Sequence, residues 1–448
     1  MQDLAALRQL GDVEVLVAGD PAYDDARRSF NGLIDRRPLV IVRPQGTDGV
    51  AGAVRWAGEA GVPVCVRGGG HSVAGHSVAD GALMVDLSGM RSVDIEPGQR
   101  VAHADGGCQW LDVDTATQAH GLAVTGGTFV DTGIGGLTLG GGIGYLGSSC
   151  GLTCDNLVAA DLVTAAGDVL HVTEHTDPEL LWALRGGGGN FGVVTRFTYR
   201  LHQVGLMYGG GLYYRREDLS EVLTRVREVI ASAPDALMLA LFLGRRPGFP
   251  DPVVELLVAF SGPAADGEDA IQALRTLPVM DDRVGPMSYG ALQAYNALLP
   301  FGIRHYWKGH FVREMSDDVI AATAAAWATH PEPTGGILIE LLSGVARREG
   351  AETASFGQRA AAANVSAIAA WRDASEDEAQ IAWSRAFADA LAPHSLTGGG
   401  YVNYATPDEP ADRVRSAYGP ERYDRLVAVK RRLDPTNRFR YNLNIAPD

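Results

Sequence analysis

The chain has 448 residues, of which 46% are apolar and 21% are charged, and this composition is typical of a globular protein with more than one domain. Its formal net charge of −16 argues against nucleic acids and anionic membranes as partners, because both bind basic surfaces. The sequence shows no secretory signal and no run of about 18 apolar residues, so we expect a cytoplasmic protein without a membrane-spanning helix.

The first 205 residues alternate between strand and helix patterns. Residues 39–42 and 62–66 predict strands, and the periodicity of 47–61 predicts a helix capped by Thr47. This β-α-β unit leads directly into the glycine loop at 68–70, and ligands favour such strand ends. Beyond it the pattern predicts a hairpin, a short helix and another strand, over residues 157–173, 177–185 (with Asp177 as its cap) and 193–199.

From about residue 206 strands outnumber helices, and some strands follow each other directly. This order implies a mainly antiparallel sheet with helices on one face. The expected strands are 212–214, 236–243, 253–260, 304–312 and 336–342, and the expected helices are 218–232, 266–276, 317–329 and 378–391. Three glycines at 398–400 precede a last segment with a motif of its own.

Glycine is concentrated in residues 126–192, which hold 17 of the 56 glycines. Because glycine weakens helices and strands, such density indicates positive φ angles or the close approach of backbone to a ligand. The run Gly142-x-Gly144-x-x-Gly147 matches a dinucleotide fingerprint, but that fingerprint needs an apolar strand before it, and glycines precede it here. The alternative that these glycines only form tight turns stays open.

The four cysteines, Cys65, Cys108, Cys150 and Cys154, are too few and too scattered for a disulfide framework. Cys150 and Cys154 have loose metal-like spacing, but no further His or Cys cluster completes a ligand set. We therefore expect no metal.

Five ordered motifs resemble the FAD-linked oxidases of the berberine bridge enzyme type, within the vanillyl-alcohol oxidase superfamily with its PCMH-type FAD domain. The motifs span residues 67–72, 132–146, 151–156, 184–192 and 401–404. The resemblance implies an α+β fold. Its FAD domain would consist of residues 1–205 together with the returning segment 395–448, and a substrate domain with a mainly antiparallel sheet covered by helices would span 206–394.

The resemblance also implies a cofactor, FAD, bonded covalently to His71. Backbone N–H groups of the glycine loops would bind its pyrophosphate, since such nests hold anions without basic side chains. Many relatives carry a second, cysteinyl tether, but Phe129 stands at that position, so His71 would be the single anchor. The other implied cofactor contacts are Arg67, Gly68, Gly69, Gly70, Ser72, Gly75, Gly126, Gly127, Thr132, Gly133, Gly135, Gly136, Leu137, Thr138, Gly142, Gly144, Leu146, Asp155, Asn156, Gly192, Val194, Tyr401, Asn403, Tyr404 and Asn442.

Tyr404 matches the tyrosine proposed as the catalytic base in several relatives. A phenol has an ordinary pKa of about 10, so its pKa must be lowered by a neighbour to act near neutrality, and the candidates are Lys308 and the flavin itself. Strand alternation puts Tyr306 and Lys308 on one face and Trp307 on the other, and Lys308 could orient an oxyanion if its face meets the flavin. The alternatives are a solvated Lys308 and a Tyr404 that only packs near the ring.

The implied activity is an oxidase reaction, in which a small alcohol, sugar, amine or phenol-like substrate gives hydride to flavin N5 and dioxygen is reduced to hydrogen peroxide. Within the family, the sequence resembles bacterial members whose flavin is held by a single histidyl bond, and this resemblance suggests a role in bacterial secondary metabolism. One alternative is an oxygenase with an oxygenated flavin N5 acting on a polyketide-like or aromatic substrate, for which Thr132 and Leu137 match an oxygen pocket. Another is a non-catalytic flavin binder. Substrate identity and oligomeric state stay open.

Overall fold

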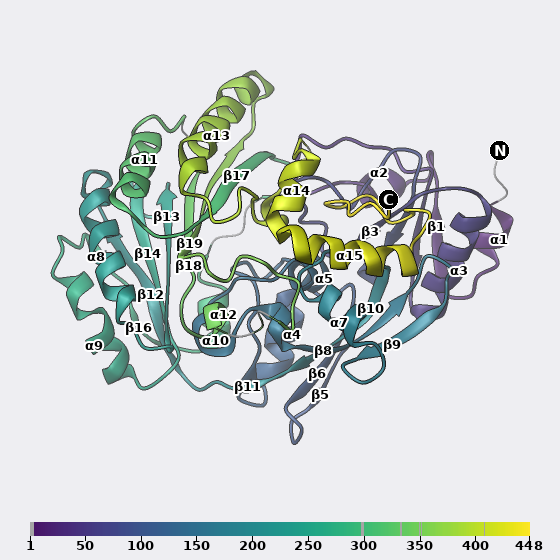
Figure 1. Ribbon diagram of the computed structural model, residues 1–448, viewed down its shortest axis with the longest axis horizontal. Coiled ribbons are helices and arrows are strands. Elements are labelled where there is room, and N and C mark those ends of the chain that lie inside the picture. Colours follow the sequence, from purple (N-terminus) through teal and green to yellow (C-terminus); the bar gives the residue numbers. More distant parts are fainter. Residues whose placement is uncertain (1–3, 297–299, 332–333, 349, 351, 407) are drawn as a thin grey trace.

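The computed structural model describes residues 4–296, 300–331, 334–348, 350, 352–406 and 408–448. The fold is α+β, with sheets at both ends of the elongated molecule in Figure 1. Among the described residues, every helix is too short or too polar to cross a bilayer.

The N-terminal sheet contains the predicted β-α-β unit. Its strands lie in the order β1 (Val13–Leu16), β2 (Val40–Pro44), β4 (Leu83–Asp86) and β3 (Val64–Arg67), and helices α1 (Ala5–Arg8), α2 (Tyr23–Ala26) and α3 (Thr47–Glu59) accompany them. β2 and β3 both pair with β4 in parallel, as the α3 crossover requires. The predicted cap was wrong: Gly46 is the N-cap of α3, because the Thr47 hydroxyl bonds to that of Thr195, 3.0 Å away.

The second sheet is antiparallel and runs in the order β5 (Val93–Glu96), β6 (Val101–Asp105), β10 (Val193–Arg200), β8 (Leu157–Val163) and β9 (Val169–Thr173). The predicted hairpin is β8–β9, and Asp177 caps helix α7 (Pro178–Leu184) by accepting from the Leu180 N–H. Around this sheet lie α4 (Trp110–Gln118), α5 (Ile134–Leu139), α6 (Gly147–Cys150) and the small pair β7 (Leu122–Ala123) and β11 (His202–Gln203).

The large sheet is antiparallel throughout, as predicted. Its order is β15 (Asp281–Asp282), β12 (Met207–Tyr214), β14 (Val253–Phe260), β13 (Leu237–Gly244), β18 (Gly335–Leu341), β19 (Ala363–Trp371) and β17 (Arg304–Val312), with β16 (Gly285–Met287) also on β12. β19 was not predicted from the sequence. It lies between β18 and β17 and pairs with both.

Helices α8 (Leu219–Ala231), α9 (Ala264–Arg275), α11 (Asp317–Ala328) and α13 (Asp377–Leu391) cover one face of the large sheet, as Figure 1 shows. Their apolar residues, such as Val222 and Phe387, share a core with Leu239 and Ile337 of the strands. Because side chains alternate along a strand, the neighbours of these strand residues point to the other face, toward α10 (Tyr289–Gln293), α12 (Gly344–Arg348) and the rest of the chain.

The C-terminal segment returns to the half of the molecule that holds the first two sheets (Figure 1). Helices α14 (Ala411–Tyr418) and α15 (Pro420–Leu433) share a core with α7 and β10. The ammonium of Lys430, which is fully buried, donates to Asp434 Oδ2 at 2.7 Å, to the Asn190 carbonyl at 2.8 Å and to the Phe439 carbonyl at 2.9 Å. This lysine fastens the end of the chain to the glycine loop at 186–189.

Candidate functional site

A cavity of about 290 Å³ lies where both ends of the chain meet the large sheet. Its lining combines the loop after β3, the start of α5, the loop 188–190, the segment 401–404 and three strands of the large sheet. The predicted residues that line it are Gly68, Gly69, Gly70, His71, Ser72, Thr132, Gly133, Gly135, Gly136, Leu137, Gly192, Val194, Tyr401, Asn403, Tyr404 and Asn442.

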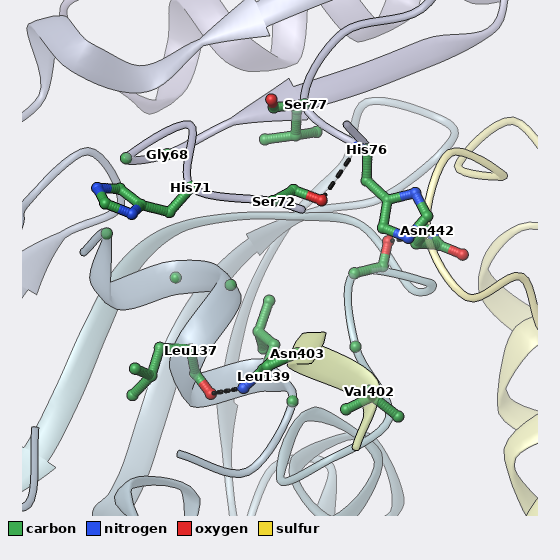
Figure 2. Close-up of a pocket in the computed structure, with 18 of the residues that line it drawn as sticks. Gly68, His71, Ser72, His76, Ser77, Leu137, Leu139, Val402, Asn403 and Asn442 are labelled. Carbon is green, nitrogen blue, oxygen red and sulfur yellow. Dashed lines mark hydrogen bonds between the residues drawn. The ribbon is translucent and has the colours of Figure 1, made fainter. Parts of the chain in front are cut away.

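Two of the glycines are needed because the loop after β3 touches the start of α5. A Cβ on Gly69 would lie 2.4 Å from the Gly133 nitrogen, and a Cβ on Gly133 would lie 2.2 Å from the Gly69 nitrogen. No side chain fits at either position without moving backbone. This contact brings His71 beside the first turn of α5 (Figure 2).

His71 lines the cavity inside a cage of rings. Its imidazole stacks on Phe30 with ring centres 4.7 Å apart and meets the edge of Phe301 at 5.0 Å. Its Nε2 lies 3.2 Å from Oδ2 of Asp131, a carboxylate that the sequence analysis did not single out. The rings and the carboxylate together restrict the orientation of the imidazole.

The cavity has open space beside two glycines and buried polar atoms without protein partners. A Cβ on Gly136 or Gly189 would meet nothing within 4 Å, although both glycines line the cavity. The buried Nε2 of His76 and Oδ1 of Asn442, both in the lining and labelled in Figure 2, have no hydrogen-bond partner in the structure. Bare backbone and unpaired buried polar atoms fit a large cofactor with polar edges, such as FAD.

The segment 401–404 is hydrogen-bonded to the glycine-rich turn after α5. The Tyr401 hydroxyl accepts from the Gly142 N–H at 3.0 Å and from the Ile143 N–H at 3.3 Å. The amide of Asn403 donates to the Leu137 carbonyl at 3.2 Å, the bond drawn in Figure 2. Tyr404 follows directly, so these bonds set the position of its phenol.

Tyr404 contacts a carboxylate rather than a cation. Its hydroxyl donates to Oε1 of Glu340, 3.0 Å away, and the other Glu340 oxygen accepts from the Asn364 amide at 2.8 Å. Burial raises the pKa of Glu340 to about 7. Burial and the Glu340 charge raise the pKa of Tyr404 well above its ordinary value. Lys308, one of the two neighbours expected to lower this pKa, pairs with Glu409 instead.

A catalytic role for Lys308 would require its face of β17 to meet the cavity, but the opposite face of the strand does so. Trp307 lines the cavity and meets the Tyr404 ring edge-on, with centres 5.1 Å apart. Tyr306 turns toward the helices and donates to Asp408 at 2.9 Å, and Lys308 pairs with Glu409 at 3.2 Å. Neither Tyr306 nor Lys308 is part of the described lining of the cavity, so the structure does not support their predicted catalytic roles.

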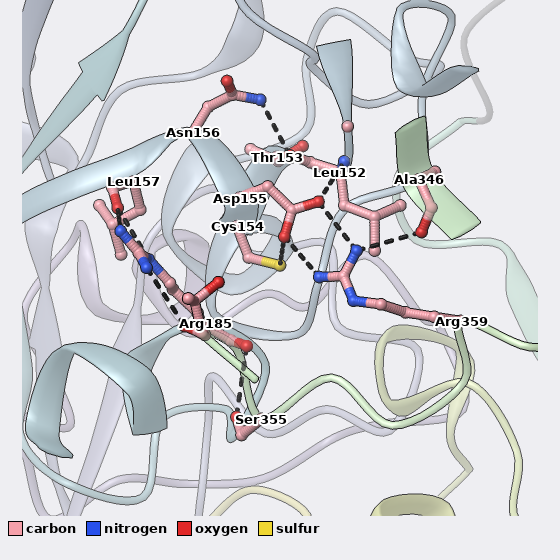
Figure 3. Close-up of polar contacts among 12 residues, drawn as sticks. Leu152, Thr153, Cys154, Asp155, Asn156, Leu157, Arg185, Ala346, Ser355 and Arg359 are labelled. Carbon is pink, nitrogen blue, oxygen red and sulfur yellow. Dashed lines mark hydrogen bonds and ion pairs between the residues drawn. The ribbon is translucent and has the colours of Figure 1, made fainter. Parts of the chain in front are cut away.

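Further predicted contacts fall outside the described lining of the cavity. Asp155 forms a buried ion pair with Arg359, shown in Figure 3, and accepts from the Leu152 N–H at 2.8 Å. The Asn156 amide donates to two backbone carbonyls, at 3.0 Å each. The other predicted cofactor contacts that lie outside this lining are Arg67, Gly75, Gly126, Gly127, Thr138, Gly142, Gly144 and Leu146.

Several of these residues instead form hydrogen bonds or close packing contacts between the loops around the cavity. Arg67 donates to the carbonyls of Ala26 and Arg28, and the Thr138 hydroxyl lies 2.7 Å from that of Tyr199. A Cβ on Gly144 would lie 1.9 Å from the Gly126 carbonyl oxygen, so that glycine is needed for packing between two loops. Leu146 belongs to an apolar core. The motifs thus combine residues that line the cavity with residues that support its loops.

The structure adds lining residues that the sequence analysis missed. His76 lies five residues after His71, and burial lowers its pKa to about 4, so its imidazole is neutral. Gly188, Gly189 and Asn190 belong to a motif that was recognised, although only its last glycine was carried over. The lining from the large sheet had no local signal, because it joins strands far apart in sequence.

This fold and cavity define a flavin-dependent oxidoreductase, and comparison with known proteins agrees. A family model for an FAD binding domain matches residues 38–173, and a model described as berberine and berberine like matches residues 400–446. The chain belongs to the FAD-linked oxidoreductases of the berberine bridge enzyme-like family, and FAD is its cofactor.

Among its relatives is an FAD-linked oxidoreductase of Dictyostelium discoideum, 31% identical over 94% of this chain and 92% of the relative. (R)-6-hydroxynicotine oxidase of Paenarthrobacter nicotinovorans is 31% identical over 97% of both chains. The crystal structure of 6-hydroxy-D-nicotine oxidase from Arthrobacter nicotinovorans superposes with a TM-score of 0.87 at 31% identity, over 97% of this chain and 98% of that one. A glucooligosaccharide oxidase of Acremonium strictum shares the fold, with a TM-score of 0.89 at 22% identity over 99% and 98% of the two chains.

Proposed function

We propose that this chain is an oxidase of small organic substrates, alcohols, sugars, amines or phenols, that uses dioxygen. When bound, FAD supplies a hydride acceptor at N5 and passes the electrons on to dioxygen, which leaves as hydrogen peroxide. The observation that carries the proposal is the hydrogen bond from Tyr404 to Glu340 at the wall of a cavity lined by FAD motifs. One relative, (R)-6-hydroxynicotine oxidase, has a named activity of the same kind.

In this proposal Tyr404 and Glu340 take up the substrate proton together. A substrate O–H or N–H gives its proton to the Tyr404 oxygen while Tyr404 passes its own proton to Glu340, whose Oε1 lies 3.0 Å from the Tyr404 oxygen. In this relay Tyr404 stays protonated throughout. Its raised pKa is consistent with this, because it disfavours the ionised phenol near neutral pH. A carboxyl with a pKa of about 7 is well matched to accept a proton at neutral pH.

We further propose that His71 is the single covalent anchor. Phe129 lines the cavity at the place of the second tether of other members, and the four free cysteines are absent from the described lining. The contact between Asp131 and His71 Nε2 supports the proposal, because a carboxylate at one nitrogen of an imidazole makes the other a better nucleophile.

The division into residues 1–205 with 395–448 and residues 206–394 is also a proposal. One apolar core draws its buried residues from Tyr208 to Leu391, and another joins residues between Ala102 and Leu201 with residues from Val414 onward. The cavity lies between these cores. A cytoplasmic location stays a prediction.

The direct test is a screen for peroxide release from purified holoenzyme with alcohols, sugars, amines and phenols. We expect turnover with one class and a yellow protein whose colour survives acid precipitation. A colourless precipitate would contradict the covalent anchor. If every substrate class that reduces the flavin gives no peroxide, the proposed oxidase activity is wrong.

A further inference from the structure

Strand β19 carries two buried polar side chains in an otherwise apolar run. Asn364 and Ser366 stand among alanine, valine, isoleucine and tryptophan in Ala363–Trp371, and they are 0% and 1% exposed. They lie two residues apart and therefore share one face of the sheet, and Glu340 is the cross-strand partner of Asn364 on that face. A buried polar group costs free energy unless it is hydrogen-bonded, so the partners of these two side chains are informative.

The two side chains form a chain of hydrogen bonds that ends at Glu340. The Ser366 hydroxyl donates to Oδ1 of Asn364 at 3.0 Å, and Nδ2 of Asn364 donates to Oε2 of Glu340 at 2.8 Å. The other carboxyl oxygen, Oε1, accepts from Tyr404. Each oxygen of the buried carboxyl group therefore has its own donor. Of these four residues, only Tyr404 belongs to the described lining of the cavity.

Gly309 of β17 makes room for the Ser366 hydroxyl. The two residues are cross-strand partners. A Cβ on Gly309 would lie 2.4 Å from Oγ of Ser366 and 2.2 Å from the Val365 carbonyl oxygen. A side chain at position 309 would therefore displace both the hydroxyl and the backbone of β19. The neighbouring strand thus accommodates the serine in the position from which it reaches Asn364.

This chain of hydrogen bonds favours the ionised form of Glu340. Hydrogen bonds to charged acceptors are stronger than those to neutral ones, so an amide N–H stabilises a carboxylate more than a carboxylic acid. Burial raises the pKa of Glu340 to about 7, and the hydrogen bonds from Asn364 and Tyr404 oppose this rise. Ser366 acts on this balance through Asn364, because a hydroxyl proton at the amide oxygen keeps the NH₂ group turned toward the carboxylate.

Beyond the relay, the ionisable groups close enough to feel the charge of Glu340 are phenols. Burial raises the pKa of both Tyr145 and Tyr401, so both stay neutral near pH 7. Glu255 and Arg246 act on Tyr145 from its other side and pair with each other. Glu340 itself forms no ion pair within the described part of the chain, so hydrogen bonds alone oppose the cost of burying its charge.

We propose that Asn364, held by Ser366, is a positioning residue of the proton relay between Tyr404 and Glu340. Its amide fixes Oε2 of Glu340 so that Oε1 faces Tyr404, and it stabilises the ionised carboxylate that accepts the proton. This inference rests on the proposed function, because it assigns supports to the base of that reaction. Neither Asn364 nor Ser366 belongs to the described lining of the cavity, so both act through Glu340.

The first test compares the pH dependence of kcat/KM in Asn364→Leu, Ser366→Ala and the native holoenzyme, with a substrate from the peroxide screen. Each variant leaves ionised Glu340 less stabilised, so the midpoint of the rise should move to higher pH, by about one unit in Asn364→Leu and about half a unit in Ser366→Ala. Ser384→Ala is the matched control, because it removes a buried hydroxyl of α13 that donates to the Gln380 carbonyl at 2.9 Å, and it should leave the midpoint unchanged. A fall in kcat/KM at every pH without a shift overturns the inference.

The double variant Asn364→Leu/Ser366→Ala distinguishes a chain of hydrogen bonds from two independent effects. Because Ser366 acts through Asn364, its removal should shift the midpoint no further once residue 364 is leucine. A merely structural serine would add its own effect in either background. Additive shifts in the double variant therefore overturn the inference.

A titration of Glu340 itself separates this inference from the proposed function. Infrared difference spectra of the holoenzyme record, without turnover, the carboxyl band that is lost in Glu340→Gln. If this band titrates at higher pH in Asn364→Leu and Ser366→Ala but kcat/KM does not follow it, the inference stands and the proposed relay is wrong. If kcat/KM follows the band in the native protein and the band does not move in the variants, the relay stands and the inference is wrong. If no substrate gives turnover, the infrared titration alone decides.

Discussion

The Tyr404 hydroxyl lies 3.0 Å from Oε1 of Glu340 and donates a hydrogen bond to it. The two residues come from a C-terminal turn and from a strand of the large sheet, so the pair exists only when both parts of the fold are in place. Burial raises the pKa of Glu340 to about 7 even though the hydrogen bond from Tyr404 lowers it, whereas burial and the Glu340 charge both raise the pKa of Tyr404.

Glu340→Gln should change the pH dependence of turnover. Because Glu340 must be ionised to accept a proton, kcat/KM of the native protein should rise with pH and level off above about 7, its raised pKa. The variant should lack this rise and lose roughly 100-fold or more in kcat/KM at pH 8. Tyr404→Phe should lose a similar factor. A Glu340→Gln variant with the native pH profile contradicts the relay.

Asp131→Asn should reduce covalent attachment without abolishing FAD binding. Asp131 contacts His71 Nε2 at 3.2 Å, whereas the glycine backbone that would hold the rest of the cofactor is untouched. The mass of the denatured protein gives the covalent fraction, and flavin released by acid gives the non-covalent fraction. Asp94→Asn, at an exposed ion pair with Arg196, is the matched control. Full attachment in Asp131→Asn would show that the carboxylate is not needed.

Lys430→Met should destabilise the fold by about 3–5 kcal/mol, because it leaves the Asp434 carboxylate buried without its cation. It should also speed loss of non-covalent FAD from a His71→Ala background, since Lys430 holds the glycine loop through the Asn190 carbonyl. Arg432→Met removes an exposed pair with Asp177 and should change stability by less than about 1 kcal/mol. Thermal unfolding and fluorescence of released flavin provide the measurements, and equal effects of both variants contradict the proposed fastening.

Asp114→Asn should stabilise the protein at pH 8 but not at pH 4. Asp114 is buried, its carboxylate accepts a hydrogen bond from the Gln293 amide at 3.0 Å, and burial raises its pKa from 3.8 to about 7. The folded state therefore holds this proton more tightly than the unfolded state, and stability falls as pH rises between these two values. Asparagine cannot ionise, so the variant should lack this loss. The thermal midpoint at both pH values tests this, with exposed Asp251→Asn as the control.

Turnover in labelled dioxygen separates the oxidase from the oxygenase alternative. We expect the label in hydrogen peroxide and none in the organic product. Thr132 and Leu137 line the cavity, as an oxygen pocket beside the flavin would require. Label in the organic product would therefore favour the oxygenase and contradict the proposed reaction.

Local patterns predicted most of the helices and strands well. The strand at 304–312 has the predicted bounds, and Asp177 caps its helix as its position before Pro178 indicates. β19 was missed because Ala363–Trp371 is rich in alanine, which has low strand propensity, and its pairing with β17 and β18 on both sides stabilises it.

The orientation of strands around the cavity was beyond local patterns. Alternation correctly separates Trp307 from Lys308, but it does not say which face the helices cover. That choice depends on α11 and α13, whose apolar side chains pack with Tyr306 in one core. Glu340 likewise gave no signal, because its partner Tyr404 lies 64 residues further along the chain.

The cavity draws on residues from Phe30 to Leu443, so its wall stays incomplete during synthesis until nearly all of the described chain has left the ribosome. The first sheet and the glycine loops emerge early and must wait for α15 and Asn442 before they enclose anything. We therefore expect flavin loading to follow translation, so a ribosome-bound chain stalled before α14 should neither retain the cofactor nor become yellow.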